Sequence, residues 1–386
     1  MNVSTPAVSC PVCAALPPDR TSEIRWPAPV AQDEWVHDDR VRGALLGLAI
    51  GDALGGLRRS GEKLPADLVP GALVTGGATQ LGLFTTEALI RMYVRVQAKG
   101  IGPAWAVIRH GLDRWMFTQG RPPHPIFGPQ GDDWPDGWLV RQHRLHRRID
   151  GFDATVSALN SEMDPAEGLV DRHVPPTVPN TSTGAGAIVR VAGAGLVARP
   201  KDAFLVGAIA SAYTHGAADA YLAGAALARI VAGLVDGDPI GGVLNETREE
   251  LSRWPGGDAI RAALASPGGK TTSSATRALA AGVEYLSLPD SATPIAAIAH
   301  AISRGGTAAG VTTGVVIGAR HGASAFPSGW SVAPDIADIV EEVARATSAA
   351  HRAWAMDRDL PGYSELPDGA FEDPSCALFW PRFPGW

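Results

Sequence analysis

The chain has 386 residues and a formal net charge of −7, with a pI near 5.8. Its length allows one large domain or two ordinary ones. The acidic balance argues against a nucleic-acid partner, because phosphate backbones bind basic surfaces. Cys10 and Cys13 form a CPVC pair, but the tail supplies no two further zinc ligands at ordinary spacing. An incidental pair and a zinc or redox site both stay open.

Residues 1–36 are rich in proline and show no periodicity, which predicts a tail. They lack a basic start followed by an apolar run, so we expect no secretory signal peptide. The longest apolar stretch, residues 204–235, contains His215, Asp219 and Arg229, which argues against a membrane span. We therefore expect a cytoplasmic protein without a membrane partner.

Alanine and glycine dominate the rest of the chain, and helical periods explain it better than the alternation typical of strands. The first helix is predicted to begin near Asp38 or Asp39, where an acidic start precedes a regular apolar face. Two more helices are predicted over 79–98 and 103–117. The fold class that follows is mostly helical.

A long loop is predicted over 121–137, where Pro, Gly and Asp crowd together, with Trp134 and Trp138 folded onto the body. A helix follows over 137–160, and its Arg and His residues either recognise phosphate or form a solvated face. Further helices are predicted over residues 202–236, 241–265, 273–288, 293–303, 308–321 and 334–355, which makes about ten in all. The helical domain then spans 37–357, and residues 358–386 form an extension rich in proline and aromatic residues.

Four segments stand in a fixed order along this domain. They are RVRGALLGLAIGDALGGL (40–57), ATQLGLFTTEALI (78–90), SAYTHGAADAYLAGAALARIVAGL (211–234) and TTGVVIGARHGASAFP (312–327). Together they resemble the ADP-ribosylglycohydrolase family, which includes the dinitrogenase reductase-activating glycohydrolases. The resemblance implies an all-α, orthogonally packed single domain with a central cleft for ADP-ribose.

In active members, the resemblance also implies two magnesium or manganese ions in the cleft. A Thr-Asp-Asp-Thr run at the start of the second helix and an Asp-x-Asp-Thr run near the end hold them, because hard cations take oxygen ligands. Residues 76–79 (GGAT) and 305–308 (GGTA) stand at these two runs here, and neither contains an acid. We therefore expect no metal and no other cofactor.

Besides the two runs without acids, the chain differs from active members of the family after the first helix, where they carry a Glu a few residues beyond the GDALG run. Arg58 or Arg59 takes that place, and Glu62 would need a three-residue shift to substitute for it. The segment similar to the family's GNGAAMR run reads GAGAIVR, with Ala185 replacing the Asn and Arg190 retained. We expect Arg190 to pair internally.

The altered positions predict a ligand site of reversed charge. Short residues before a helix leave its first N–H groups accessible, and such N-termini attract anions. An anion or polar group would then lie where relatives hold metals, with Arg58 or Arg59 as the cation. Drift in an unused site, where small residues only fill space, is the competing interpretation. The predicted ligand-binding residues are Arg59, Gly76, Gly77, Ala78, Thr79, Gly184, Gly186, His215, Gly305, Gly306 and Thr307.

Four residues remain as candidates for catalysis or ligand contact. Asp52 is a lone carboxylate in an apolar helix, where it performs catalysis or, more simply, anchors a loop or caps a neighbouring helix. His215 matches a family histidine near the ligand and could donate to a ribose or phosphate oxygen, or be a satisfied structural histidine. Asp150 and Asp153 lie in a segment similar to a loop near the cleft, with a helix-start acid as the simpler role.

Two classes of function follow. The first is a non-catalytic relative that binds ADP-ribose, a nucleotide-like ligand, an ADP-ribosylated protein or a protein with ADP-ribosyltransferase activity. The second is a metal-independent enzyme, a glycosyl hydrolase or another chemistry on a small polar substrate, in the same cleft. Convergent polar groups with a perturbed carboxylate or histidine favour the second, and an apolar or filled cleft favours the first.

Overall fold

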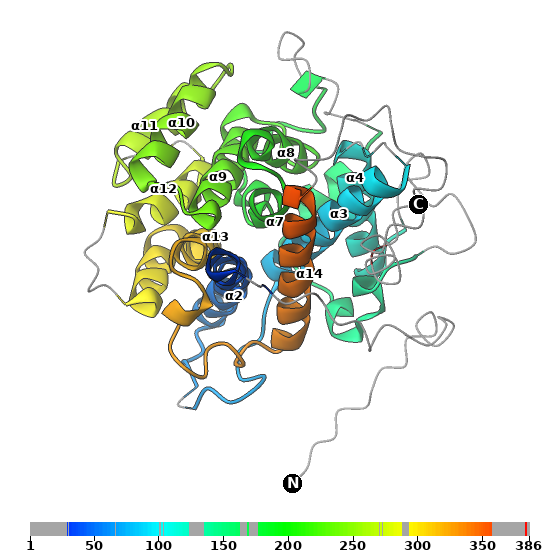
Figure 1. The fold of residues 1–386 in the computed structure, drawn as a ribbon, viewed down its shortest axis with the longest axis vertical. Coiled ribbons are helices and arrows are strands. Elements are labelled where there is room, and N and C mark those ends of the chain that lie inside the picture. Colours follow the sequence, from blue (N-terminus) through cyan, green and yellow to red (C-terminus); the bar gives the residue numbers. More distant parts are fainter. Residues whose placement is uncertain are drawn as a thin grey trace.

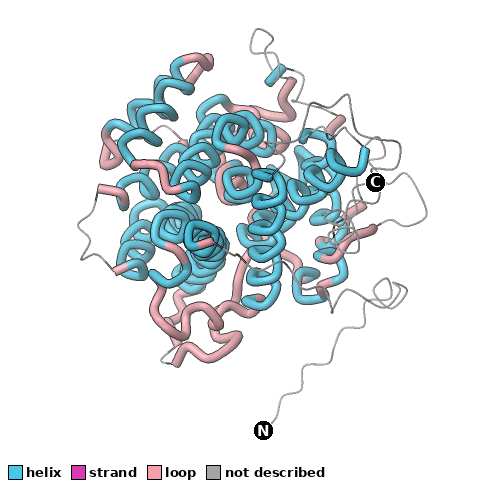
Figure 2. Tube along the Cα trace, in the orientation of Figure 1, coloured by secondary structure: helices cyan, strands magenta, loops and turns pink. Residues whose placement is uncertain are grey.

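A computed structural model describes residues 29, 31–65, 67–99, 102, 104–122, 135–162, 168–169, 177–269, 271, 273–287, 293–356 and 383. This part of the chain is built from α-helices, short 3₁₀ turns and loops (Figures 1 and 2). Its only β-type pairing is an isolated bridge between Leu73 and Pro334. The all-α fold expected from the sequence is confirmed.

The α-helices are α2 (Gln32–Ser60), α3 (Gly77–Lys99), α4 (Ala104–Thr118), α5 (Asp153–Leu159), α7 (Ala192–Val197), α8 (Pro200–Ala212), α9 (Ala218–Asp236), α10 (Ile240–Ser252), α11 (Asp258–Ala265), α12 (Ser274–Tyr285), α13 (Pro294–His321) and α14 (Ala337–Met356). Four 3₁₀ turns join them: η2 (Leu139–Arg141), η3 (His143–His146), η4 (Ala185–Ala187) and η5 (Ala323–Ala325). In Figure 1, α2 and α13 are seen almost end-on while α14 runs across the view, so the helices cross at steep angles.

The closest helix pair is α2 with α13, which lie side by side in Figure 1. Glycines recur every four residues along both facing ridges. Going along α2, Gly43 meets Gly318 and Gly322, Gly47 meets Gly314, Gly51 meets Gly310, and Gly55 meets Thr307. A Cβ added at any of these α2 glycines would overlap backbone or, at Gly55, the Thr307 side chain. The two backbones therefore touch, which only the smallest residue permits.

Helix α9 lies at the centre of the core and packs against α7, α8, α10, α12 and α13. It is long and apolar enough to cross a membrane, but 89% of its apolar window is buried inside the structure. Neighbouring helices therefore cover its apolar surface, as expected for the core helix of a packed domain.

The predicted helix over 137–160 is wrong. The segment instead forms η2, η3 and the short α5, with left-handed glycines at Gly137 (φ 106°) and Gly151 (φ 85°). Its basic residues have protein partners: Arg144 pairs with Asp338 at the start of α14, and Arg147 with Asp335. These long-range ion pairs hold the segment in an irregular path that its local helical pattern does not reveal.

Two predicted long helices are each divided. The one over 202–236 separates into α8 and α9, and Arg190 donates to the carbonyls of Ala210 and Ser211 at the end of α8. These bonds also confirm the internal pairing expected for Arg190. The one over 241–265 divides at Trp254–Gly257, where Gly256 is left-handed (φ 85°) after a proline.

At the other boundaries the differences are smaller. Helix α2 begins at Gln32, before the predicted end of the tail at residue 36. Helix α13 spans both predicted helices over 293–303 and 308–321, but it has a kink at Gly306 (φ 74°, ψ −167°). Trp138 is buried as predicted. Cys10, Cys13, Trp134, Cys376 and the extension apart from a buried Phe383 lie outside the described residues.

A buried ionic cluster attaches the residues before η2 to α3 and α4. Arg91 of α3 and Arg114 of α4 both pair with Asp136, and the two guanidinium groups are fully buried. These cations lower the pKa of Asp136 against the opposing effect of burial. The pairs are needed because an isolated buried charge would cost several kcal/mol.

We expect Gly47→Ala to lower the free energy of unfolding by about 3 kcal/mol, because the new methyl group overlaps the Gly314 carbonyl and separates α2 from α13. Gly56→Ala in the same helix is the matched control. No atom lies within 4 Å of a Cβ there, so it should leave stability unchanged or raise it by up to about 1 kcal/mol. Urea unfolding of both variants checks this. Equal stability of the two would contradict the proposed backbone contact.

Candidate functional site

A cavity of about 390 Å³ opens where the C-terminal half of α2, the start of α3 and the kink of α13 meet. Its other walls come from residues 150–155, from residues 182–189 and from the turn after α8. The lining residues are Asp52, Arg59, Gly77, Ala78, Asp150, Gly151, Phe152, Ala154, Thr155, Ser182, Gly184, Ala185, Gly186, Val189, His215, Thr307 and Ala308. The cavity thus collects side chains from six separate parts of the chain.

Asp52 of α2 caps the N-terminus of α3. Its Oδ2 accepts hydrogen bonds from the backbone N–H of Gly76 (2.8 Å), from that of Thr79 (2.9 Å) and from the Thr79 hydroxyl (2.8 Å). The side chain is only 2% exposed, and burial raises the pKa of the Asp52 carboxyl despite these bonds. Two of the N–H groups expected to face a ligand are therefore used inside the protein.

The cavity floor at the start of α3 has no room for larger side chains. A Cβ at Gly76 would lie 2.7 Å from Oδ1 of Asp52. A Cβ at Gly77 would overlap the Phe152 ring and lie 2.8 Å from Cγ2 of Ile149. Phe152 packs edge-on against the buried Trp115 (ring centroids 6.1 Å apart), so its position is supported from behind. Aromatic packing thus occupies the space beside these glycines.

Arg59 and Thr307 close the rim on the side of α13. Arg59 extends from the last turn of α2, and its guanidinium donates to the Thr307 hydroxyl. Thr307 directly follows the left-handed Gly306, and its side chain also lies against Gly55 of α2. The kink therefore brings a hydroxyl and a cation to the same edge of the cavity.

His215 forms the opposite wall and is 2% exposed. Burial, reinforced by the charge of Arg190, lowers its pKa to about 3, so the imidazole is neutral near pH 7. The Thr214 hydroxyl lies 2.8 Å from Nδ1 but 3.4 Å from the carbonyl of Ser211, and Thr214 already accepts from Arg190. The Thr214 hydroxyl therefore donates to an unprotonated Nδ1, so the ring N–H of His215 is on Nε2.

Two glycines keep the Nε2 edge of His215 uncovered. A Cβ at Gly184 would lie 3.0 Å from Nε2, and one at Gly186 would lie 2.9 Å from it. Asn180 ties their loop to the turn after α8, since its side chain donates to the carbonyl of Thr214 and accepts from the N–H of Gly216. The result is a hydrogen-bond donor presented to the cavity.

Comparison with known families decides what this helical arrangement is. The family model described as ADP-ribosylglycohydrolase matches residues 34–357. The chain belongs to the ADP-ribosylglycohydrolase family. A solved structure described as "ADP-ribosylglycohydrolase-related protein complex" is similar to 82% of this chain and 99% of its own, with a TM-score of 0.53 and 20% identity. At that identity it supports the fold alone. Comparison with curated proteins found no match.

Most of the predicted site residues meet in the cavity, but not all. Asp52, Asp150 and His215 line it, as do Arg59, Gly77, Ala78, Gly184, Gly186 and Thr307. Gly76 and Thr79 instead bind Asp52 behind the floor. Gly306 forms the kink, and Gly305 faces another cavity. Sequence analysis missed Phe152, Thr155 and Ser182 among the lining residues. Ser182 lies two positions before the GAGAIVR run, but nothing local marks Phe152.

The metals that family membership implies need several carboxylates, and the residues present do not match that requirement. Among the described residues that line the cavity, only Asp52 and Asp150 carry a carboxylate. Oδ2 of Asp52 already accepts three hydrogen bonds. An acid at position 77 would displace Phe152. This donor set does not fit two dications, which prefer six or more oxygen ligands each.

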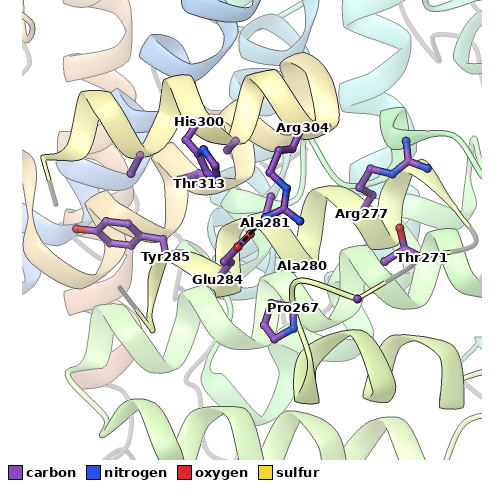
Figure 3. Close-up of a pocket in the computed structure, with 14 residues that line it drawn as sticks. Pro267, Thr271, Arg277, Ala280, Ala281, Glu284, Tyr285, His300, Arg304 and Thr313 are labelled. Atoms are coloured by element: carbon purple, nitrogen blue, oxygen red, sulfur yellow. Dashed lines mark hydrogen bonds and ion pairs between the residues drawn. The ribbon is translucent and has the colours of Figure 1, made fainter. Parts of the chain in front are cut away.

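A further cavity of about 370 Å³ lies on the other side of the kink, between α12 and α13. Its polar lining includes Arg277, His300 and an ion pair between Arg304 and Glu284 (2.7 Å) (Figure 3). Gly305 lines this cavity while Thr307 lines the site described above. Residues of the same turn of α13 therefore line the two cavities on opposite sides.

We expect Asp52→Ala to lower the free energy of unfolding by about 2 kcal/mol, since it leaves the N–H groups of Gly76 and Thr79 without their acceptor. Asp52→Asn keeps an acceptor and should cost less. The exposed Asp150→Asn is the control and should be near neutral.

The raised pKa of Asp52 also predicts that the stability of the protein depends on pH. Its pKa is raised in the folded state, so the native protein retains a proton that the unfolded chain has released. Stability should therefore fall as pH rises from about 4, the ordinary Asp value, through the raised native pKa. Asp52→Asn should lack this fall. Urea unfolding between pH 4 and pH 8 measures it, and identical pH profiles of wild type and Asp52→Asn would contradict the assignment.

Proposed function

We propose that this family member binds ADP-ribose, or another small polar nucleotide-like ligand, in the cavity beside Asp52 without two-metal hydrolysis. The observation that carries the proposal is the filled floor: Phe152 and Asp52 occupy the space beside Gly77 and Gly76, where active relatives place metal-binding acids. A cavity of about 390 Å³ remains above this floor. That volume is within the usual range for small-molecule sites, about 300–1,000 Å³.

The polar lining suits such a ligand. Arg59 uses one of its five N–H donors on Thr307 and can offer the rest of its planar fork to a phosphate. The neutral Nε2–H of His215 can donate to a ribose or phosphate oxygen, and Asp150 on the rim can accept from a ribose hydroxyl. In this proposal the anion is held by these side chains in place of metal ions.

A partner protein is a further part of the proposal. A solved relative is described as a protein complex, and an ADP-ribosylated protein or an ADP-ribosyltransferase would present the same ligand chemistry to this cavity. Neither nucleic acid nor a membrane is proposed as a partner, given the net charge of −7 and the buried α9. We propose that the protein works in the cytoplasm.

The second candidate is a metal-independent enzyme in the same cavity. The observation that favours it is the convergence of polar groups around two residues with perturbed pKa values, Asp52 and His215. Against it, a histidine with a pKa of about 3 is a poor general base near pH 7. Asp52 is also engaged in capping α3. Binding is therefore the preferred function.

Calorimetric titration of ADP-ribose in excess magnesium and in EDTA tests the proposal directly. We expect the same affinity in both buffers, because side chains and not metal ions hold the ligand. Binding only with magnesium would refute the metal-free site. Absence of binding in both buffers would refute ADP-ribose as the ligand. The enzyme would be favoured instead if the protein released ADP-ribose from an ADP-ribosylated protein in EDTA and Asp150→Asn abolished that release.

The neighbouring residues Arg58 and Arg59 provide a matched test of whether Arg59 binds the ligand. Arg59→Ala should weaken ADP-ribose binding by about tenfold, roughly 1.4 kcal/mol, since it removes the guanidinium from the rim. Arg58→Ala changes the same charge at the exposed neighbouring position, which does not line the cavity. It should bind as wild type does. Equal losses for both variants, or unchanged binding by Arg59→Glu, would exclude a specific role for Arg59.

A further inference from the structure

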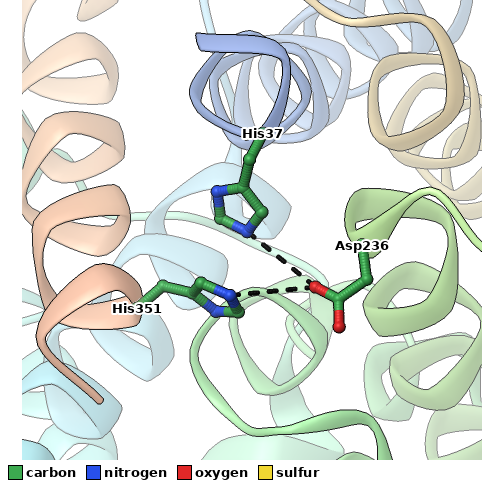
Figure 4. A group of neighbouring side chains, drawn as sticks. All are labelled: His37, Asp236 and His351. Carbon is green, nitrogen blue, oxygen red and sulfur yellow. Dashed lines mark ion pairs between the residues drawn. The ribbon is translucent and has the colours of Figure 1, made fainter. Parts of the chain in front are cut away.

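Three potential metal ligands meet at the other end of α2. His37 from the second turn of α2, Asp236 from the last residue of α9 and His351 from α14 converge in Figure 4. Nε2 of His37 lies 4.0 Å from Oδ1 of Asp236, and Nε2 of His351 lies 3.8 Å from the same oxygen. One ligand atom from each of the three residues lies within 4.8 Å of the other two.

These distances are too long for direct hydrogen bonds, which span about 2.7–3.2 Å. They are close to the separation of two ligands on one tetrahedral zinc ion, about 3.4 Å for bonds of about 2.0–2.2 Å. Both ring nitrogens of His37 are buried and make no hydrogen bond within the described residues. A buried polar atom without a partner is costly, so an ion between the three residues would relieve a real deficit.

We propose that His37, Asp236 and His351 bind a divalent transition-metal ion, with Zn²⁺ the best match. Two imidazoles and one carboxylate are typical zinc ligands, whereas Mg²⁺ and Ca²⁺ prefer oxygen alone. The Asp236 side chain is 27% exposed, so solvent can reach the site and supply the fourth ligand. The carbonyl end of α9 adds a favourable dipole for a cation.

The surrounding charges are compatible with this site. Asp38 lies 3.9 Å from Nδ1 of His37 and can orient the ring from its outer side. Two cations are near. Arg352 is paired with Asp38, and Arg40 donates to the carbonyl of Val235. The charge of Arg352 is thus compensated by Asp38, whereas Arg40 keeps its charge and is held at the end of α9 by the Val235 carbonyl.

This site would join three helices and is separate from the ligand cavity. His37 and Asp52 are fifteen positions apart on α2, which places them about 22 Å apart along the helix axis. A metal ion would tie α2 to the end of α9 and to α14, and would therefore stabilise the fold. The inference does not depend on the proposed function.

Zinc titration and thermal unfolding of the full chain test the inference. Cys10 and Cys13 could bind zinc on their own, so the experiment uses a Cys10→Ser/Cys13→Ser background after treatment with EDTA. We expect one Zn²⁺ per chain and a rise in melting temperature of roughly 5 °C. Co²⁺ should give the visible bands of tetrahedral coordination without the near-ultraviolet band of a thiolate ligand.

Single variants identify the ligands. His351→Ala and Asp236→Asn should each abolish the zinc-dependent rise, while His300→Ala, an exposed histidine of α13, should retain it. The readout for each variant is the difference between its melting temperatures with and without zinc. A purely structural role of the histidines would change both temperatures alike and leave this difference unaltered. Two results would overturn the inference: zinc binding that disappears in the Cys10→Ser/Cys13→Ser background, or a zinc-dependent rise in melting temperature that survives both ligand variants.

Discussion

The backbone contact between α2 and α13 is the constraint on which the other features depend. Glycines spaced four apart form one continuous ridge on each helix, and the two ridges meet along four successive turns of α2. Each close approach requires the absence of a side chain on α2, so the glycine spacing permits the register that the pair adopts. That register determines which parts of two segments distant in the sequence lie opposite each other.

The C-terminal half of this helix pair builds the ligand cavity. Gly55 lies against Thr307, so the kink at Gly306 falls beside the last turns of α2, where Arg59 emerges. Asp52, about two turns before Arg59, binds the start of α3. A carboxylate that could have served chemistry instead positions a helix, and its raised pKa reflects burial in that role. The other polar groups of the cavity are then Arg59, the carboxylate of Asp150, the neutral His215 and several hydroxyls.

Sequence reasoning succeeded where a pattern is local. The helical period, the family-like segments and the missing acids at 76–79 and 305–308 are readable in the chain itself. It failed where distant residues intervene. The segment 137–160 has a helical pattern, but ion pairs from Arg144 and Arg147 to residues before and within α14 hold it in an irregular path. At the division of 202–236, Arg190 binds the end of α8, and it is twenty residues away from the Ala210 carbonyl that accepts its hydrogen bond.

The sequence by itself determined the helical class, the family and the absence of acids at two runs, because composition, periodicity and motif spacing are properties of neighbouring residues. Only the tertiary structure decided what occupies the resulting space. Phe152 fills the position beside Gly77, and no local signal marks it, since the two lie 75 positions apart. The cluster of His37, Asp236 and His351 is equally hidden. Its members come together only because the start of α2 lies beside the C-terminal ends of α9 and α14. That arrangement depends on long-range packing.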